Sequence, residues 1–97
     1  MRVITGTARG RKLTAPPGLD TRPTTELVKE AVFSMIQFEV EGARVLDLFA
    51  GSGQMGIEAL SRGASTCVFV ENGKLAQKAA AENIASTGFS GAGRLLR

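Results

Sequence analysis

The spacing of hydrophobic and polar residues changes several times along the chain, and each spacing predicts a different element. Two short segments near the N-terminus, 2–6 and 11–14, have the composition of strands and lie on either side of a basic turn that contains glycine. This arrangement predicts a β-hairpin. Two prolines within 15–18 remove backbone donors, so we expect the hairpin to end there in a turn or a short extended linker.

A helical spacing follows the hairpin. Hydrophobic residues recur at i, i+1, i+4, i+5, i+8 and i+9, which places them on one face of a helix that must pack against an apolar surface. We expect Thr24 or Thr25 to cap this helix, with Glu26 near its positive N-terminal end. The predicted inward face consists of Leu27, Val28, Ala31, Val32, Met35 and Ile36.

The rest of the chain alternates between strand and helix patterns. Short apolar runs at 44–49 and 66–70 are typical of the central strands of a parallel sheet. Helical patterns at 55–61 and 74–87 alternate with them, and the run at 94–97 has the composition of a further strand. This order predicts an α/β fold with a parallel sheet. The inward face predicted for the last helix consists of Leu75, Ala76, Ala79, Ala80 and Ile84.

The number of predicted parallel strands is small for such a fold. The chain offers two or three, whereas a doubly wound sheet has about five or more. We therefore expect the chain to be the first half of a larger fold, or to pair with another chain, including a second copy of itself, that covers the sheet. We divide it into a hairpin extension over 1–20 and the first half of a cofactor-binding domain over 21–97.

Composition narrows the class of protein. A chain of 97 residues with 43% hydrophobic content forms one soluble domain at most. It has no apolar run of about 18 residues and does not begin like a signal peptide, so we expect a cytoplasmic protein. The lack of histidine and the single cysteine, Cys67, argue against a metal site and an internal disulfide. The apolar surroundings of Cys67 favour a buried thiol over a nucleophile.

Positive charge is concentrated at the front of the chain. The first 22 residues carry a net charge of +4 and the whole chain +3, so the other 75 residues sum to −1. A basic segment of this kind is typical of proteins that bind a polyanion such as nucleic acid, but basic residues also protect the exposed edges of strands. The basic residues of this segment are Arg2, Arg9, Arg11, Lys12 and Arg22.

A glycine-rich turn, GSGQMG at 51–56, lies between a predicted strand and a predicted helix and matches the pattern G-x-G-x-x-G. Glycine lets the backbone approach a ligand closely while amide N–H groups point outward. Glu71, at the end of the next strand, is placed to accept hydrogen bonds from ribose hydroxyls. These features suit any ligand that contains adenosine, so a dinucleotide and S-adenosylmethionine are both open.

Asp47, near the end of the first parallel strand, helps to separate these two ligands. A carboxylate at this position repels a pyrophosphate, but it stabilises the ammonium and the sulfonium of S-adenosylmethionine. Asp47 therefore favours the methyl donor. The same side chain can cap the turn by accepting backbone N–H bonds, and the two roles can coexist.

Six blocks of sequence then occur in a fixed order along nearly the whole chain. They lie at 1–6, 8–13, 21–25, 28–31, 45–53 and 56–64. Together they resemble the RsmD-type bacterial methyltransferases, which methylate the exocyclic N2 of a guanine in 16S ribosomal RNA. The ordered set is far more specific than the glycine turn alone, and it indicates the N-terminal half of such an enzyme.

The resemblance implies a Rossmann-like methyltransferase fold with an N-terminal hairpin that helps to grip RNA. It implies that the turn holds the methionine end of S-adenosylmethionine and that Glu71 holds the ribose. It also implies that Arg22 and Thr24 lie near the cofactor pocket. Arg22 has an alternative role, an ion pair with Asp20 or Glu26 at the start of a helix. The implied cofactor-binding residues are Asp47, Phe49, Ala50, Gly51, Ser52, Gly53, Glu71, Arg22 and Thr24, and the implied phosphate contacts are Arg2, Arg9, Arg11 and Lys12.

The chain departs from the family in one respect. These enzymes use an Asp or Asn followed by two prolines and an aromatic residue, which together hold the target amine and stack on the extruded base. The Pro-Pro pair at 16–17 lies between Ala15 and Gly18 and supplies neither an acceptor nor a ring. We therefore expect the catalytic residues beyond Arg97 and an isolated chain without activity. Two alternatives are a fragment of a nicotinamide-dependent oxidoreductase and a non-enzymatic RNA-binding module.

Overall fold

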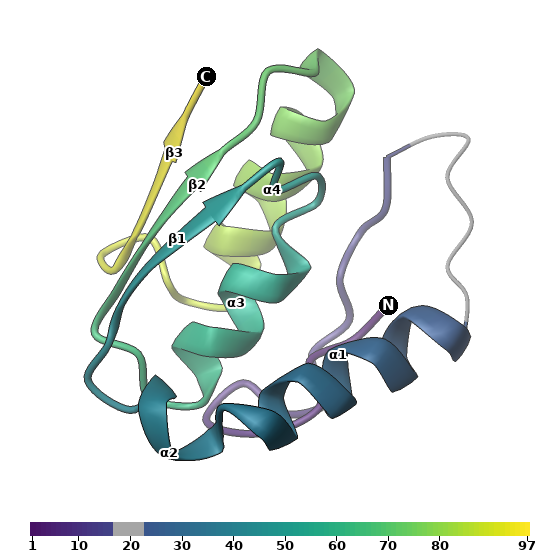
Figure 1. Ribbon diagram of the computed structural model, residues 1–97. Helices are drawn as coiled ribbons and strands as arrows, with labels where there is room; N and C mark the ends of the chain where they lie inside the picture. The colour runs from purple at the N-terminus through teal and green to yellow at the C-terminus, as the bar shows by residue number, and fades with distance from the viewer. Residues whose placement is uncertain (17–22) are drawn as a thin grey trace.

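A computed structural model gives the fold and describes residues 1–16 and 23–97. Its three strands form one parallel sheet in the order β1-β2-β3, where β1 is Arg44–Leu48, β2 is Thr66–Val70 and β3 is Gly93–Leu96 (Figure 1). The predicted α/β class is confirmed, and β2 has the predicted bounds. No helix in the described part of the chain is long and apolar enough to cross a membrane. The elements are α1 (Pro23–Met35), α2 (Gln37–Val40), β1 (Arg44–Leu48), α3 (Gln54–Ser61), β2 (Thr66–Val70), α4 (Lys74–Ser86) and β3 (Gly93–Leu96).

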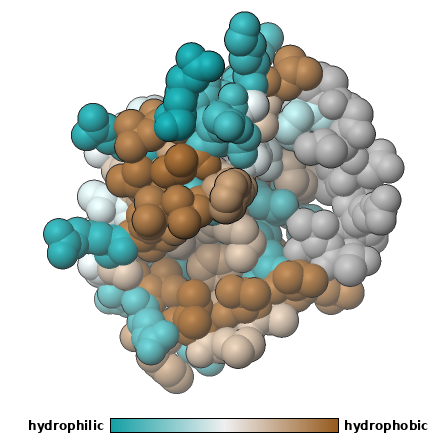
Figure 2. All heavy atoms as spheres, turned by 45° about the horizontal axis from the view of Figure 1, so that its top comes forward, coloured by the Kyte–Doolittle hydropathy of each residue, from teal (hydrophilic) through white to brown (hydrophobic). Residues whose placement is uncertain are grey.

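The two faces of the sheet are covered differently. Helices α3 and α4 lie on one face (Figure 1), where Cys67 and Phe69 of β2 are 1% and 0% exposed. The predicted burial of Cys67 is confirmed, and this burial raises the pKa of its thiol to about 12. Leu46 and Leu48 of β1 point to the other face and are 61% and 57% exposed. Figure 2 shows hydrophobic side chains gathered in two areas of the surface.

The N-terminal segment, residues 1–16, pairs with itself and is here called the arm. Arg2 and Lys12 form an isolated antiparallel bridge, and Val3 N donates to Arg11 O at 2.9 Å. The chain therefore reverses direction within the arm, as the predicted hairpin requires. It does not contain the two regular strands that we predicted over 2–6 and 11–14.

Side chains of α3 explain why the strands of the arm are so short. Ile4 N and Thr5 N donate to the two carboxylate oxygens of Glu58 at 2.9 and 3.0 Å. Ala8 N donates to Ser61 Oγ at 3.0 Å. In a regular hairpin only alternate N–H groups join the ladder, so after Val3 N, which donates to Arg11 O, the next would be Thr5 N. Because Glu58 accepts the hydrogen bond from Thr5 N, the ladder does not continue past the single bridge.

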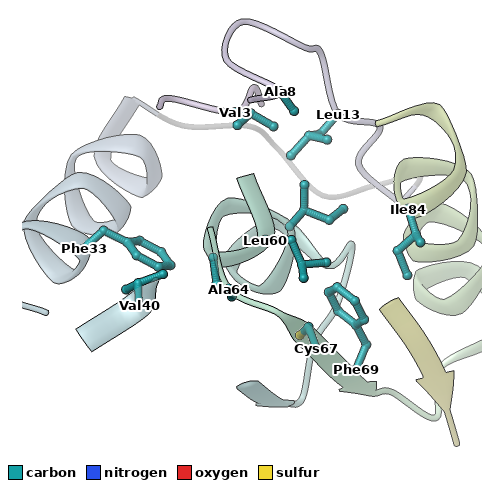
Figure 3. Close-up of a cluster of buried hydrophobic side chains, with 12 residues drawn as sticks. Val3, Ala8, Leu13, Phe33, Val40, Leu60, Ala64, Cys67, Phe69 and Ile84 are labelled. Carbon is teal, nitrogen blue, oxygen red and sulfur yellow. The ribbon is translucent and has the colours of Figure 1, made fainter. Parts of the chain in front are cut away.

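The hydrophobic core forms around α3. Val3, Ala8 and Leu13 of the arm lie on one side of this helix, and Cys67 and Phe69 of β2 lie on the other side (Figure 3). All five side chains are buried. The arm therefore shares one core with the sheet, and its position relative to the sheet is fixed by packing as well as by hydrogen bonds.

The inward face predicted for the first helix is wrong at four of its six positions, since only Val32 and Ile36 are partly buried. Leu27, Val28 and Met35 of α1 are 66%, 55% and 85% exposed. The buried side chains of α1 include Lys29 and Phe33, at 0% and 4% exposed. A helical spacing identifies an apolar face, but it does not say which of the neighbouring elements that face meets. Here the arm and α3 meet a different side of the helix.

Two further details differ from the sequence expectation. Helix α1 begins at Pro23, a residue that suits a first helical turn, so the backbone of Thr24 and Thr25 lies within the first turn and not at the position before the helix where we predicted a cap. In α4, Leu75 is 58% exposed, while Asn83 takes an inward position at 1% exposed. The predicted inward residues of α4 that are buried are Ala79, Ala80 and Ile84.

Candidate functional site

The glycine turn joins β1 to α3 at the carboxyl edge of the sheet. Phe49, Gly51 and Gly53 have positive φ angles of 57°, 59° and 83°. Glycine adopts this conformation without strain, whereas phenylalanine rarely does. A Cβ on Gly51 would meet no atom within 4 Å, but a Cβ on Gly56 would lie 2.7 Å from Cys67 Sγ. The first glycine therefore leaves space beside the turn, and the last lets α3 pack closely on β2.

Asp47 ties β1 to the first turn of α3. Its Oδ2 accepts a hydrogen bond from Gly56 N at 3.0 Å. Burial raises the pKa of Asp47, and the hydrogen bond from Gly56 opposes this rise. Its other oxygen, Oδ1, accepts no hydrogen bond from the part of the chain that the structure describes. The capping role considered for Asp47 is thus present, and one carboxylate oxygen is left over for a ligand.

Glu71 holds the same turn from the end of β2. Its Oε1 accepts a hydrogen bond from Gly51 N at 2.8 Å, and its Oε2 accepts one from Gly73 N at 2.9 Å. The bonds from Gly73 and Gly51 lower the pKa of Glu71, because they stabilise the ionised carboxylate. Each oxygen keeps a further lone pair. Glu71 is therefore a fixed, negatively charged acceptor at the edge of the turn.

The start of α3 also faces this edge. The N–H groups of Gln54 and Met55 donate to no acceptor within the described ranges, as the first amides of a helix often do. The buried Oε1 of Gln54 lacks a hydrogen-bond partner within the same ranges. A helix start with unused N–H groups attracts a negatively charged group. The turn thus combines donors for an anion with carboxylate acceptors.

The structure brings together most of the predicted cofactor residues. Asp47, Glu71 and the turn between them lie at one edge of the sheet, and Phe49 beside them is 92% exposed. Ala50 N donates to Val70 O at 2.9 Å, which joins the turn to β2. Arg22 lies outside the described residues, and of Thr24 the structure describes only the backbone, in the first turn of α1.

Sequence reasoning missed Asn83, which contacts the turn from α4. Its Nδ2 donates to Ser52 O at 2.9 Å and to Thr14 O at 2.9 Å, and its Oδ1 accepts from Thr14 N at 2.7 Å. One signal was available in the sequence. Asn83 stands three residues after Ala80, so the helical spacing places it on the buried side of an alanine-rich helix.

The basic residues predicted to contact RNA lie on the arm. Arg9 and Lys12 are exposed and form no ion pair with the described residues. Arg2 Nε lies 3.7 Å from Glu26 Oε2, and Arg11 Nη1 donates to Ser86 O at 3.5 Å. Both of these contacts are at the surface, so the four cations are accessible to a polyanion.

A buried charged cluster holds the arm, and its two central residues were also missed. Lys29 and Glu58 are both 0% exposed, with Nζ and Oε1 3.5 Å apart. Lys29 Nζ donates to Arg2 O at 2.7 Å, and Arg62 Nε donates to Glu58 Oε2 at 2.8 Å while its guanidinium lies over the Phe33 ring. Burial lowers the pKa of Lys29, and Glu58 opposes this effect. Lysine and glutamate are common on helix surfaces, so the sequence did not single them out.

Comparisons with known proteins give the family. All residues, 1–97, match the model of the family described as Conserved hypothetical protein 95. A candidate rRNA methyltransferase of Bacillus subtilis strain 168, YlbH, is 59% identical over 71 residues, which are 73% of this chain and 39% of that protein. Ribosomal RNA small subunit methyltransferase D of Escherichia coli strain K12 is 40% identical over 86 residues, which are 89% of this chain and 43% of that protein.

A solved structure agrees with these relatives. A candidate methyltransferase of Escherichia coli, yhhF, superposes with a TM-score of 0.86 and 34% identity, over 99% of this chain and 51% of that chain. This chain thus spans less than half the length of the two curated relatives and about half of the solved one. The predicted Rossmann-like methyltransferase fold is confirmed for the part of that fold that this chain spans. The chain therefore belongs to the Conserved hypothetical protein 95 family, that of the RsmD-type methyltransferases.

Proposed function

We propose that this chain is the part of a methyltransferase that binds S-adenosylmethionine and grips RNA. The enzyme would transfer a methyl group to the exocyclic N2 of a guanine in small-subunit ribosomal RNA. The observation that carries the cofactor assignment is the geometry of the turn, where Glu71 accepts a hydrogen bond from Gly51 at its start and Asp47 accepts one from Gly56 at its end. The names of the relatives support the RNA substrate.

The residues at the turn fit S-adenosylmethionine. The space beside Gly51 admits a ligand close to the backbone, and the unused N–H groups of Gln54 and Met55 suit the methionine carboxylate. The spare oxygen of Asp47 suits the ammonium group. The remaining lone pairs of Glu71 suit the ribose hydroxyls. When bound, the cofactor supplies a methyl group on an electrophilic sulfonium, and this chain orients it.

A dinucleotide fits the same turn less well. Its pyrophosphate would lie against the turn close to Asp47, whose carboxylate repels a second negative group. Glu71 suits the ribose of either ligand and does not separate them. Asp47 therefore favours a cationic ligand over NAD.

The arm supplies the RNA contacts in this proposal. Residues 1–20 form the RNA-gripping extension, and residues 21–97 form the first half of the cofactor domain. Arg9 and Lys12 are exposed on an arm whose backbone is fixed by α3 and α4, so their charges are held in place for phosphate groups.

Calorimetry on the full chain tests the cofactor assignment. S-adenosylhomocysteine, which has the same ammonium, carboxylate and ribose groups, is expected to bind, and NAD is expected to give no heat at the same concentrations. Binding of NAD alone would indicate the oxidoreductase alternative. Binding of a small-subunit rRNA hairpin without any binding of S-adenosylhomocysteine would indicate the RNA-binding module.

A further inference from the structure

Asn83 is a buried amide that contacts both the cofactor turn and the arm. It is 1% exposed, and its side chain makes three hydrogen bonds of 2.7 to 2.9 Å to Thr14 and Ser52. Both of its N–H groups and its oxygen are therefore used. Thr14 and Ser52 are 38 positions apart in the sequence, and Asn83 on α4 brings their backbones to one point.

Other polar links between the turn and the arm are weak within the described residues. Ser52 Oγ lies 3.6 Å from Met1 Sδ, and a thioether sulfur is a poor hydrogen-bond acceptor. Thr14 and Ser52 share no backbone hydrogen bond. The amide of Asn83 is thus the strongest polar connection between these two segments.

This connection acts on the orientation of the turn. The peptide unit between Ser52 and Gly53 is planar, so its carbonyl and its N–H group are fixed together. Asn83 holds the Ser52 carbonyl, and Gly53 N donates to Ala50 O at 2.8 Å. The plane is held at both ends. The neighbouring amides that face the ligand are therefore held in one direction, which preorganises the site.

We propose that Asn83 is a positioning residue that joins the cofactor turn to the RNA-gripping arm. The amide orients Ser52 for the cofactor and Thr14 for the arm, so a change at Asn83 weakens both binding events. This inference rests on the proposed function, because it assumes that the turn binds the methyl donor and that the arm binds RNA.

Ser61 offers a matched control. Like Asn83, it is a small polar residue at 1% exposed that holds the arm, since its Oγ accepts from Ala8 N and donates to Thr5 O at 2.6 Å. Unlike Asn83, it makes no hydrogen bond to the glycine turn. Ser61→Ala therefore loosens the arm without releasing Ser52, whereas Asn83→Leu and Asn83→Asp affect both.

The test measures affinities on the full chain, with circular dichroism to verify folding. Asn83→Leu and Asn83→Asp are expected to weaken S-adenosylhomocysteine binding by about tenfold, the effect of losing one buried hydrogen bond. Binding of a small-subunit rRNA hairpin, measured by fluorescence anisotropy, is expected to weaken as well. Ser61→Ala is expected to weaken only the RNA binding.

Acidification separates a positioning role from a loss of stability. A protonated aspartic acid at position 83 has an O–H group that can donate to Ser52 O again, whereas leucine has none. The affinity of Asn83→Asp for S-adenosylhomocysteine, divided by that of Asn83→Leu, is therefore expected to rise as the pH falls. The ratio cancels the titration of Asp47, which both variants share.

The outcomes distinguish this inference from the proposed function. An unmodified chain that does not bind S-adenosylhomocysteine contradicts the proposed function. If the unmodified chain binds it, equal affinity in folded Asn83 variants overturns the positioning role, as does an equal loss in Ser61→Ala. If the variants do not fold, NMR on the unmodified chain tests the positioning role of Asn83 instead. S-adenosylhomocysteine should then shift the side-chain amide resonance of Asn83 and slow the exchange of Thr14 N–H, and no change at either overturns the role.

Discussion

The glycine turn and the arm are attached to the molecule in different ways. The turn is held mainly by residues at the ends of β1 and β2, Asp47 and Glu71, through backbone N–H groups. The arm is held by buried side chains of three helices, including Lys29 and Glu58. The turn therefore depends on the local geometry of parallel strands, whereas the arm depends on contacts between residues far apart in the sequence. This difference predicts which changes alter stability and which alter binding.

The largest expected effect is on stability, at the anchor of the arm. Glu58→Ala removes the acceptor of Ile4 N and Thr5 N and leaves Lys29 buried without its partner. We expect the free energy of unfolding to fall by about 3–5 kcal/mol, as for other broken buried ion pairs. Urea denaturation followed by circular dichroism measures it. Glu39→Ala, at an exposed position, is the control, and an equally small change in both variants would contradict the anchor role.

The next effect is on cofactor binding, at the turn. Asp47→Ala and Glu71→Ala each remove a charged acceptor beside the ligand, so we expect S-adenosylhomocysteine affinity to fall by about tenfold to a hundredfold. RNA affinity should change little, because neither side chain forms a hydrogen bond or an ion pair with the described residues of the arm. Calorimetry and anisotropy measure the two affinities, with Glu82→Ala on α4 as a matched surface control. A parallel loss of RNA affinity would remove the distinction between turn and arm.

A smaller effect is expected on RNA binding, at the surface of the arm. The double change Arg9→Glu and Lys12→Glu reverses two exposed charges, so RNA affinity should fall by roughly tenfold and depend less on salt. S-adenosylhomocysteine affinity should stay unchanged. Anisotropy titrations at two salt concentrations measure the effect. Unchanged RNA affinity would show that these residues only protect the edge of the arm.

The smallest effect is the pH dependence of cofactor binding. Burial raises the pKa of Asp47, and a ligand ammonium binds its ionised form, so affinity should rise with pH through this pKa and then level off. The lowered pKa of Glu71 keeps that residue ionised over the same range. Calorimetry at several pH values measures the slope, and Asp47→Asn should abolish it. A slope that persists in Asp47→Asn would assign the titration to another group.

The pKa shifts of Asp47 and Glu71 change the stability of the fold with pH in opposite directions. The raised pKa of Asp47 means that protonation favours the folded state, so its contribution is largest at low pH and is lost as the pH rises through that pKa. The lowered pKa of Glu71 has the opposite effect, and its contribution is lost as the pH falls through that pKa. Their opposite trends partly cancel, so cofactor affinity reports on Asp47 more clearly than stability does.

The same difference decides what the sequence could predict. The turn and its strands follow from local patterns, because short apolar runs followed within a few residues by glycine predict strands and turns directly, and β2 has the predicted bounds. Asp47 and Glu71 were found because the ends of parallel strands meet at one edge. The charge of Asp47 then favoured the methyl donor, and the resemblance to a family added the RNA substrate.

The attachments of the arm could not be predicted in this way. Lys29, Glu58 and Asn83 each form hydrogen bonds with backbone groups that lie 27 to 69 positions away. No spacing of residues in the sequence predicts a partner at such a distance. The same limit explains the error in α1, whose hydrophobic face was recognised although its neighbours were not. It also explains the short hairpin, since the competing acceptors on α3 become visible only in three dimensions.

Helix α3 sets the separation between the glycine turn and the arm. Its first turn contains Gly56, which is bonded to Asp47, and its last residue is Ser61, which is bonded to the arm. Eight residues rise about 12 Å, and each residue turns the helix by about 100°. Inserting one residue would both lengthen the helix and rotate Ser61 away from the arm. If the turn binds the methyl donor and the arm binds RNA, as proposed, the distance between the two ligands is set by the number of residues in this one short helix.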